Sequence, residues 1–143
     1  MEFYYTFIIP NLSNIVRGRK NFIIEHIEQH FSDYVSSFWE HICREAVSGN
    51  KIFGKTWKEA HRWWGSIKTG NSVKQLEVDL IAESIDGTSI IVGECKWTNP
   101  ELSSVLMKEL KQKVELLPFC KNKEIFPILF LKISPKIIRK PMI

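Results

Sequence analysis

The sequence has few cysteines, and their spacing does not organise them into a site. The three cysteines, Cys43, Cys95 and Cys120, are odd in number, lie far apart and include no CxxC pair. A disulfide framework and a zinc knuckle both depend on paired, regularly spaced cysteines, so neither is indicated. A reducing compartment, the cytoplasm, fits this cysteine usage best.

Long hydrophobic runs, repeats and low-complexity tracts are also missing. The N-terminal apolar run from Phe3 to Ile9 is shorter than the roughly 20 residues that span a bilayer. No basic leader or small-residue cleavage site accompanies it, so we expect no membrane segment and no targeting signal. With 143 residues, 44% of them hydrophobic, the chain is long and apolar enough for one globular domain.

Charge is unevenly placed along the chain, which has a formal net charge of +4. From Lys96 onward there are ten Lys or Arg and only four Asp or Glu. Nucleic acids favour such a surplus, because Lys and Arg release the counterions of the phosphates. The C-terminal third therefore suits a polyanionic partner, although many unrelated proteins carry a similar charge.

Apolar periodicity predicts helix in the first half of the chain. Residues 1–20 end in a basic stretch, and we interpret them as a lead-in or connector to a domain at residues 21–143. Across residues 21–47 the apolar side chains recur every three or four positions, which indicates one or two amphipathic helices. The aromatic stretch within residues 49–70 is interpreted as a first strand or the approach to one.

A β-hairpin is the clearest prediction in the second half. Residues 75–82 and 89–97 are rich in aliphatic and β-branched side chains, which is typical of strands. Asp86-Gly87 lies between them and is a strong signal for a hairpin turn. We therefore expect the two segments to pair antiparallel.

A helix and a further strand are expected after the hairpin. Asn99-Pro100-Glu101 is a favourable helix start, with Asn99 as the N-cap, and Pro118 ends the helix. Residues 125–133 form an apolar run typical of a buried strand, which would return parallel to its neighbour after the helix. The order of elements predicts an α/β fold.

Carboxylates and a lysine are expected to meet at one end of the hairpin. Residues two apart in a strand share a face, so Glu94 and Lys96 project together while Cys95 points the other way. By the same rule Glu77 and Asp79 share a face of the partner strand. Because the hairpin brings Asp79 near Glu94, two or three carboxylates are expected to converge beside Lys96.

This combination of side chains suits a hard cation. Mg²⁺, or Mn²⁺ in its place, binds through one or two carboxylates and completes its shell with waters and substrate phosphate. The metal activates water and neutralises phosphate charge, and a nearby lysine orients the water or stabilises the developing charge. Asp79 and Glu94 are the candidate ligands, with the backbone carbonyl of Cys95, and Lys96 is the positioning residue.

The alternative for these residues is a solvated Glu94–Lys96 pair on an exposed sheet face, with Asp79 as an ordinary polar neighbour. The charged residues end the apolar run Ile90-Ile91-Val92. Unpaired charges are costly in such buried surroundings, which favours a functional reason for them.

Several segments, in order along the chain, carry a family resemblance. They are Phe3-Tyr4-Tyr5 through Pro10-Asn11-Leu12, Phe38 to Glu45, Arg62 to Gly65, Glu77 to Ala82, and Gly93 to Trp97. Together they resemble the C-terminal uncharacterised domain of archaeal-type AAA+ ATPases, which is assigned to the PD-(D/E)xK, or restriction-endonuclease-like, superfamily. The resemblance implies a central mixed β-sheet flanked by helices, Mg²⁺-dependent phosphodiester cleavage, and an ATPase domain that normally precedes this region. It places Asp79, Glu94 and Lys96 in the core motif.

Two further features have both a functional and a structural interpretation. Nucleases of this superfamily often add a glutamate from the first core helix, and Glu40 resembles it as a catalytic residue or metal ligand. Glu40 also fits a capping box with Ser37 and a surface pair with Arg44. Trp63 and Trp64 match the family's aromatic pair, but large aromatics at the edge of an element are more often core than base-stacking platforms.

Two other motifs are expected to be accidental. Residues 49–56 satisfy the Walker A pattern GxxxxGK[ST], but a P-loop needs a buried strand before it, and residues 41–47 have the pattern of an amphipathic helix. His26 and His30 lie four residues apart without the HExxH pattern of a zinc site. We expect neither a nucleotide site nor a zinc site from them.

The sequence thus predicts a metal-dependent nuclease-like domain, with DNA as the favoured substrate. The alternative is a non-catalytic module that keeps the fold for DNA binding, dimerisation or regulation of an ATPase. A homodimer stays open as well, because nucleases that cut both strands often dimerise.

Overall fold

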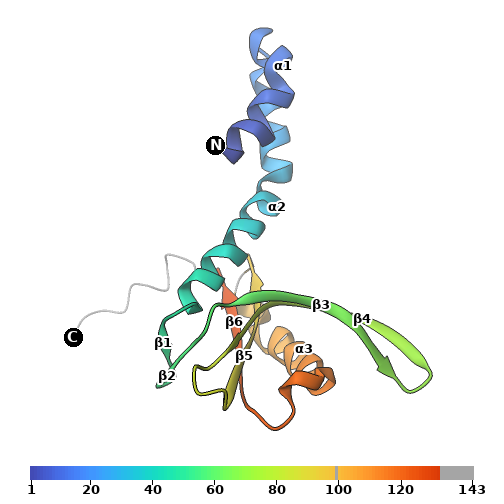
Figure 1. Cartoon of the computed structure of the whole chain (residues 1–143). Coiled ribbons are helices and arrows are strands. Elements are labelled where there is room, and N and C mark those ends of the chain that lie inside the picture. The colour runs from blue at the N-terminus through green and yellow to red at the C-terminus, as the bar shows by residue number, and fades with distance from the viewer. Residues whose placement is uncertain (99, 133–143) are drawn as a thin grey trace. The chain divides into compact units, whose positions relative to one another are not determined.

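The computed structural model of the chain describes residues 1–98 and 100–132 (Figure 1). Asn99, the expected N-cap, and Ile133, the expected end of the last strand, lie outside the described residues. Backbone contacts divide the chain into two compact units, Met1–Ser37 and Phe38–Ile143. Helix α2 (Lys20–Val47) contributes residues to both units.

The first unit is helical almost from its beginning. It comprises the π-helical turn η1 (Tyr4–Ile8), the 3-10 turn η2 (Ile9–Asn11), helix α1 (Leu12–Val16) and the first part of α2. Phe7 is fully buried with its ring 5.3 Å from that of Tyr34, and Asn11 Nδ2 donates to the Phe7 carbonyl oxygen at 2.8 Å. Residues 1–20 are therefore more than the expected connector, because Phe7 anchors them on α2, and the units divide inside α2 after Ser37.

The second unit is built on a four-stranded mixed sheet. Its order is β3–β4–β5–β6, formed by β3 (His61–Thr69), β4 (Ser72–Glu83), β5 (Ser89–Lys96) and β6 (Glu124–Leu131). The first two pairs of neighbours are antiparallel, and β5 pairs parallel with β6. The chain from β5 to β6 passes through the turn η3 (Pro100–Leu102), helix α3 (Ser103–Leu116) and the turn η4 (Pro118–Cys120). The predicted hairpin, helix and parallel strand are thus confirmed.

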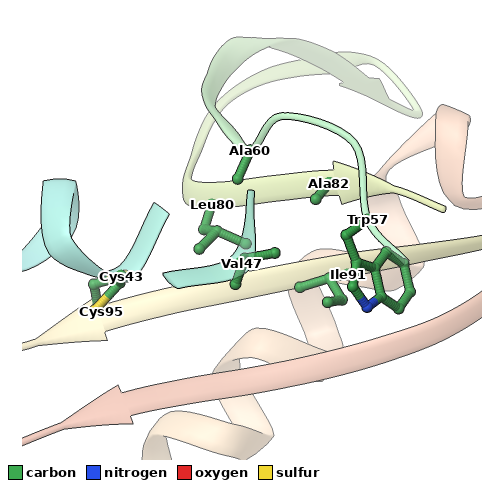
Figure 2. Packing of buried hydrophobic residues seen from close by; sticks show 8 residues of the cluster. All are labelled: Cys43, Val47, Trp57, Ala60, Leu80, Ala82, Ile91 and Cys95. Atoms are coloured by element: carbon green, nitrogen blue, oxygen red, sulfur yellow. The ribbon is translucent and has the colours of Figure 1, made fainter. Parts of the chain in front are cut away.

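Helices cover both faces of this sheet. Seven of the eight residues of β5 are buried, as expected for a strand that is enclosed on both sides. On one face Cys43 and Val47 of α2 pack with Leu80 and Ile91 (Figure 2). On the other face Leu110 of α3 packs against the neighbouring side chains of the strands. The fold is the predicted α/β class, a central mixed sheet flanked by helices.

The Walker A match forms a small β-hairpin. Strands β1 (Lys51–Ile52) and β2 (Lys55–Thr56) pair antiparallel, and both turn residues, Phe53 and Gly54, have positive φ angles of 52° and 74°. Two positive φ angles in a two-residue loop make a tight hairpin turn. Because helix α2 precedes this hairpin and a strand follows it, the strand–loop–helix geometry of a P-loop is not formed, as predicted.

Within the part of the chain that is described, no helix has the length and apolar character needed to cross a membrane.

Glu83, the last residue of β4, gives a testable pH dependence. Its carboxylate accepts hydrogen bonds from Lys123 and Lys58, each at 2.6 Å, and these bonds lower the pKa of Glu83 to about 2. A carboxyl group whose pKa is lowered by folding stabilises the fold above its unfolded pKa, and this contribution is lost as the pH falls through the folded pKa.

We therefore expect Glu83→Gln to lower the melting temperature at neutral pH. The difference in melting temperature between the variant and wild type should shrink below pH 4.5, the ordinary pKa of a glutamate, and vanish near pH 2, about the folded pKa. Thermal denaturation followed by circular dichroism across this range measures it, with the exposed Glu59→Gln as control. A deficit that stays constant down to the lowest pH would show that the ion pairs of Glu83 are not its cause.

Candidate active site

A β-bulge places Asp79 at the centre of the candidate site. His61 pairs with Ile81 and Trp63 pairs with Val78, so two residues of β4 oppose the single residue Arg62 of β3. The two residues are Asp79 and Leu80. A bulge of this kind breaks the alternation of a strand and redirects side chains, and it commonly lies next to functional sites.

The Asp79 carboxylate completes the hydrogen bonding of the neighbouring strand. The register of β4 with β5 ends at Leu80 and Gly93, although β5 continues to Lys96. Beyond that point Asp79 Oδ2 accepts the backbone N–H of Cys95 at 2.9 Å. The Asp79 side chain is only 7% exposed.

Glu94 and Lys96 project together from the end of β5, as strand alternation predicts. Lys96 Nζ lies 3.2 Å from Glu94 Oε2 and 3.8 Å from Asp79 Oδ2. A single cationic group therefore lies within ion-pair distance of both carboxylates. Burial opposes the charge of Lys96, but the carboxylates of Asp79 and Glu94 outweigh it and raise the pKa of Lys96.

Lys113 of α3 is a second lysine at this site, and sequence reasoning missed it. Its Nζ donates to Glu94 Oε1 at 2.5 Å and to the backbone oxygen of Glu77 at 3.0 Å. Burial raises the pKa of Glu94, and the bond from Lys113 acts in the opposite direction. The signal in the sequence was a lysine three residues after Leu110, on the helix face that α3 packs against the sheet.

The two buried carboxylates fit a divalent cation. Among residues 1–98 and 100–132, no three His, Cys, Asp or Glu side chains gather into a metal cage. Mg²⁺ does not need one, because it is commonly held by one or two carboxylates together with waters and substrate phosphate. Asp79 and Glu94, which already share one ammonium group, are oxygen donors of the kind that such an ion requires.

Glu40 is connected to this group through Arg44. It pairs with Arg44 at 3.6 Å on α2, and Arg44 Nη1 in turn donates to the backbone oxygen of Asp79 at 2.9 Å. The i,i+4 pair is therefore formed, whereas the capping box is wrong because Ser37 lies inside α2, where its hydroxyl donates to the Tyr34 carbonyl oxygen. A role of Glu40 as a ligand stays a prediction.

The side chain of Cys95 faces away from the carboxylates, as expected. It is buried beside Cys43 of α2, and both thiols are free (Figure 2). The neighbouring Cys43 thiol and, after it, burial raise the pKa of Cys95, so it stays protonated as a core residue. Its contribution to the site is its backbone.

Three other side chains considered from the sequence lie outside the carboxylate pair. Glu77 is exposed and pairs with Arg62, so it does not join Asp79. Trp63 packs in the core with its ring 5.3 Å from that of Phe119. Trp64, in contrast, is 71% exposed.

The comparisons with known proteins indicate a family and no activity. Residues 4–114 match the family DUF234, which is described as "Archaea bacterial proteins of unknown function". The chain is 27% identical over 141 residues to the uncharacterized protein MJECL04 of Methanocaldococcus jannaschii. This match covers 95% of the chain but 30% of the relative, so the chain spans less than a third of that protein's length. No solved structure matches the chain.

Proposed function

The chain belongs to the DUF234 family, and from the geometry of its two buried carboxylates we propose that it is a metal-dependent nuclease-like domain that hydrolyses phosphodiester bonds, with DNA as the favoured substrate. One observation carries this proposal. Asp79 and Glu94 come from adjacent strands, are each only 7% exposed, and lie within 4 Å of the same lysine nitrogen. Buried carboxylates are costly, so their convergence calls for a positively charged partner.

Each residue then has a defined part in the proposed chemistry. Asp79 and Glu94 would hold Mg²⁺ or Mn²⁺ with the Cys95 carbonyl, and Glu40 would support this shell. When bound, such an ion supplies an activated water and neutralises charge on the scissile phosphate. Lys96, which is 45% exposed, can reach the substrate from the rim and stabilise the developing negative charge.

The bulge and the backbone contacts of Asp79 support this assignment. The Cys95 N–H holds one carboxylate oxygen of Asp79, and Arg44 holds its main-chain oxygen. A ligand fixed in this way loses little freedom when a metal binds, which is the preorganisation that functional sites require. The similarity to a longer archaeal protein and the resemblance to ATPase C-terminal domains further suggest that the domain works beside an ATPase domain.

One observation favours the alternative, a non-catalytic module. Lys96 and Lys113 together balance the charges of Asp79 and Glu94, so the described residues form an ion cluster that is neutral without a metal. Such a cluster could serve the fold alone, with DNA binding or regulation as the function.

A cleavage assay separates the two functions. Supercoiled and linear DNA are incubated with the purified chain and Mg²⁺ or Mn²⁺, for wild type and for Lys96→Ala. Metal-dependent cleavage that is lost in the variant supports the nuclease. Binding of DNA without cleavage, in the presence of either metal, supports the module.

A further inference from the structure

The strands β3 and β4 form a two-stranded ribbon beyond the rest of the sheet. We define the ribbon as residues 63–78, which pair from Trp63–Val78 to Thr69–Ser72, whereas β5 pairs with β4 only from Leu80 onward. Figure 1 shows the ribbon extending past β5 and β6 of the same sheet. A two-stranded ribbon is only marginally stable by itself, so its length needs a reason.

The ribbon buries one face and leaves the other open. Trp63, Ile67, Leu76 and Val78 belong to the core cluster that includes Leu110 of α3. The alternate residues are exposed and form what we call the open face: Trp64, Ser66, Lys68, Val73, Gln75 and Glu77. No described helix or strand packs on this face, so its side chains are available to a partner.

A hollow of about 460 Å³ lies on the open face. It is lined by Arg62, Trp64, Gln75, Leu76 and Glu77. The Arg62 guanidinium carbon lies 5.9 Å from the centre of the Trp64 ring, a cation–π arrangement. The hollow therefore combines a planar aromatic surface, the ion pair of Arg62 with Glu77 and the amide of Gln75.

Charge identifies the class of partner. The ribbon contains Lys68 and Lys74 and one carboxylate, Glu77, which pairs with Arg62. Lys68 lies on the open face, whereas Lys74 alternates onto the other face with Leu76. Among the described residues no carboxylate lies within ion-pair distance of either lysine. An exposed aromatic ring with a guanidinium beside it and a lysine on the same face suits single-stranded nucleic acid, because bases stack on the ring while cations meet the phosphates.

We propose that the hollow on the open face binds an unpaired nucleobase, with Trp64 as its stacking platform, and so holds single-stranded nucleic acid a few nucleotides from Asp79. This inference rests on the proposed function and names its substrate form. Gln75 precedes Asp79 by four residues of β4, which corresponds to about 13 Å of extended chain. A strand bound at Trp64 can therefore reach Asp79 within a few nucleotides.

Binding of a fluorescein-labelled oligothymidine, measured by fluorescence anisotropy in EDTA, tests the proposal. EDTA prevents cleavage, so affinity is measured alone. We expect Trp64→Ala to weaken binding by about 5- to 140-fold, which is the effect of losing the stacking of one base on an aromatic ring. Trp64→Phe should recover most of the affinity. Because Trp64 is 71% exposed, its replacement should leave the melting temperature close to that of wild type.

The matched control removes another exposed aromatic side chain of the same unit. Phe53 is 58% exposed on the β1–β2 turn, and Phe53→Ala should bind the oligonucleotide as wild type does. Wild-type affinity in Trp64→Ala, or an equal loss in Phe53→Ala, would overturn the inference and leave the proposed nuclease untouched. A wild-type chain that binds neither oligothymidine nor duplex would overturn this inference and the nucleic-acid substrate together.

Discussion

Asp79→Asn should lower metal-dependent DNA cleavage by at least about 100-fold, because a metal contributes several kcal/mol to the stabilisation of the transition state. Asparagine keeps the shape of the side chain and an oxygen that can accept the Cys95 N–H, which Asp79 accepts at 2.9 Å. It removes the negative charge that would hold the ion. The rate of nicking of supercoiled DNA in Mg²⁺ or Mn²⁺ measures the effect.

The control for this experiment is Asp33→Asn, the same chemical change at an exposed position of α2. We expect the control to cleave at the wild-type rate and both variants to keep the wild-type circular dichroism spectrum. Cleavage by Asp79→Asn at the wild-type rate would contradict the assignment of this residue as a ligand.

Removal of both lysines from Glu94 should give the second large effect. In Lys96→Met/Lys113→Met the Glu94 carboxylate, only 7% exposed, keeps no cationic partner among the described residues. Leaving a buried charge unpaired costs about 3 kcal/mol, the lower end of the usual range, because both lysines are themselves partly exposed. We expect the free energy of unfolding, measured by urea denaturation without metal, to fall by this amount.

Added Mg²⁺ should restore part of that stability if the carboxylates bind a metal. A ligand that binds only the folded chain stabilises it. Once the ligand concentration exceeds the dissociation constant, the gain in stability grows with the logarithm of that concentration. The double variant Lys111→Met/Lys121→Met, at exposed positions, controls for the loss of two charges. A variant that is destabilised but does not respond to Mg²⁺ would support a purely structural ion cluster.

Much of the second unit could be predicted because its signals are local. Asp86-Gly87 fixes a turn whatever its surroundings, and Pro118 stops a helix by its covalent structure. The alternation of Glu94 and Lys96 likewise follows from strand geometry alone. These features therefore appear in the structure where the sequence placed them.

The parts that could not be predicted depend on tertiary contacts. Residues 1–20 look like a connector until Phe7 is seen packed against Tyr34. The length of the ribbon could not be predicted, because its two strands run beyond the rest of the sheet and their buried face is defined by packing with α3. The bulge at Asp79 arises from the pairing of two strands, so the alternation rule wrongly grouped Glu77 with Asp79.

The candidate site shows the same division between local and tertiary information. Its three motif residues lie on the two strands of the predicted hairpin. The structure brings Asp79 and Glu94 to one lysine as predicted. Lys113 lies 19 residues beyond Glu94 and reaches it only because α3 returns across the sheet. A helical periodicity shows that Lys113 faces inward, but it does not show which carboxylate it meets.

Anomalous diffraction from crystals of the chain grown with Mn²⁺ tests most directly whether Asp79 and Glu94 bind a metal. We predict one ion coordinated by carboxylate oxygens of both residues, at the distances of roughly 2 Å that are usual for oxygen ligands of small divalent cations. The position should be lost in Asp79→Asn. Crystals in which Lys96 and Lys113 still hold both carboxylates, and no ion lies between them at saturating Mn²⁺, would contradict the claim.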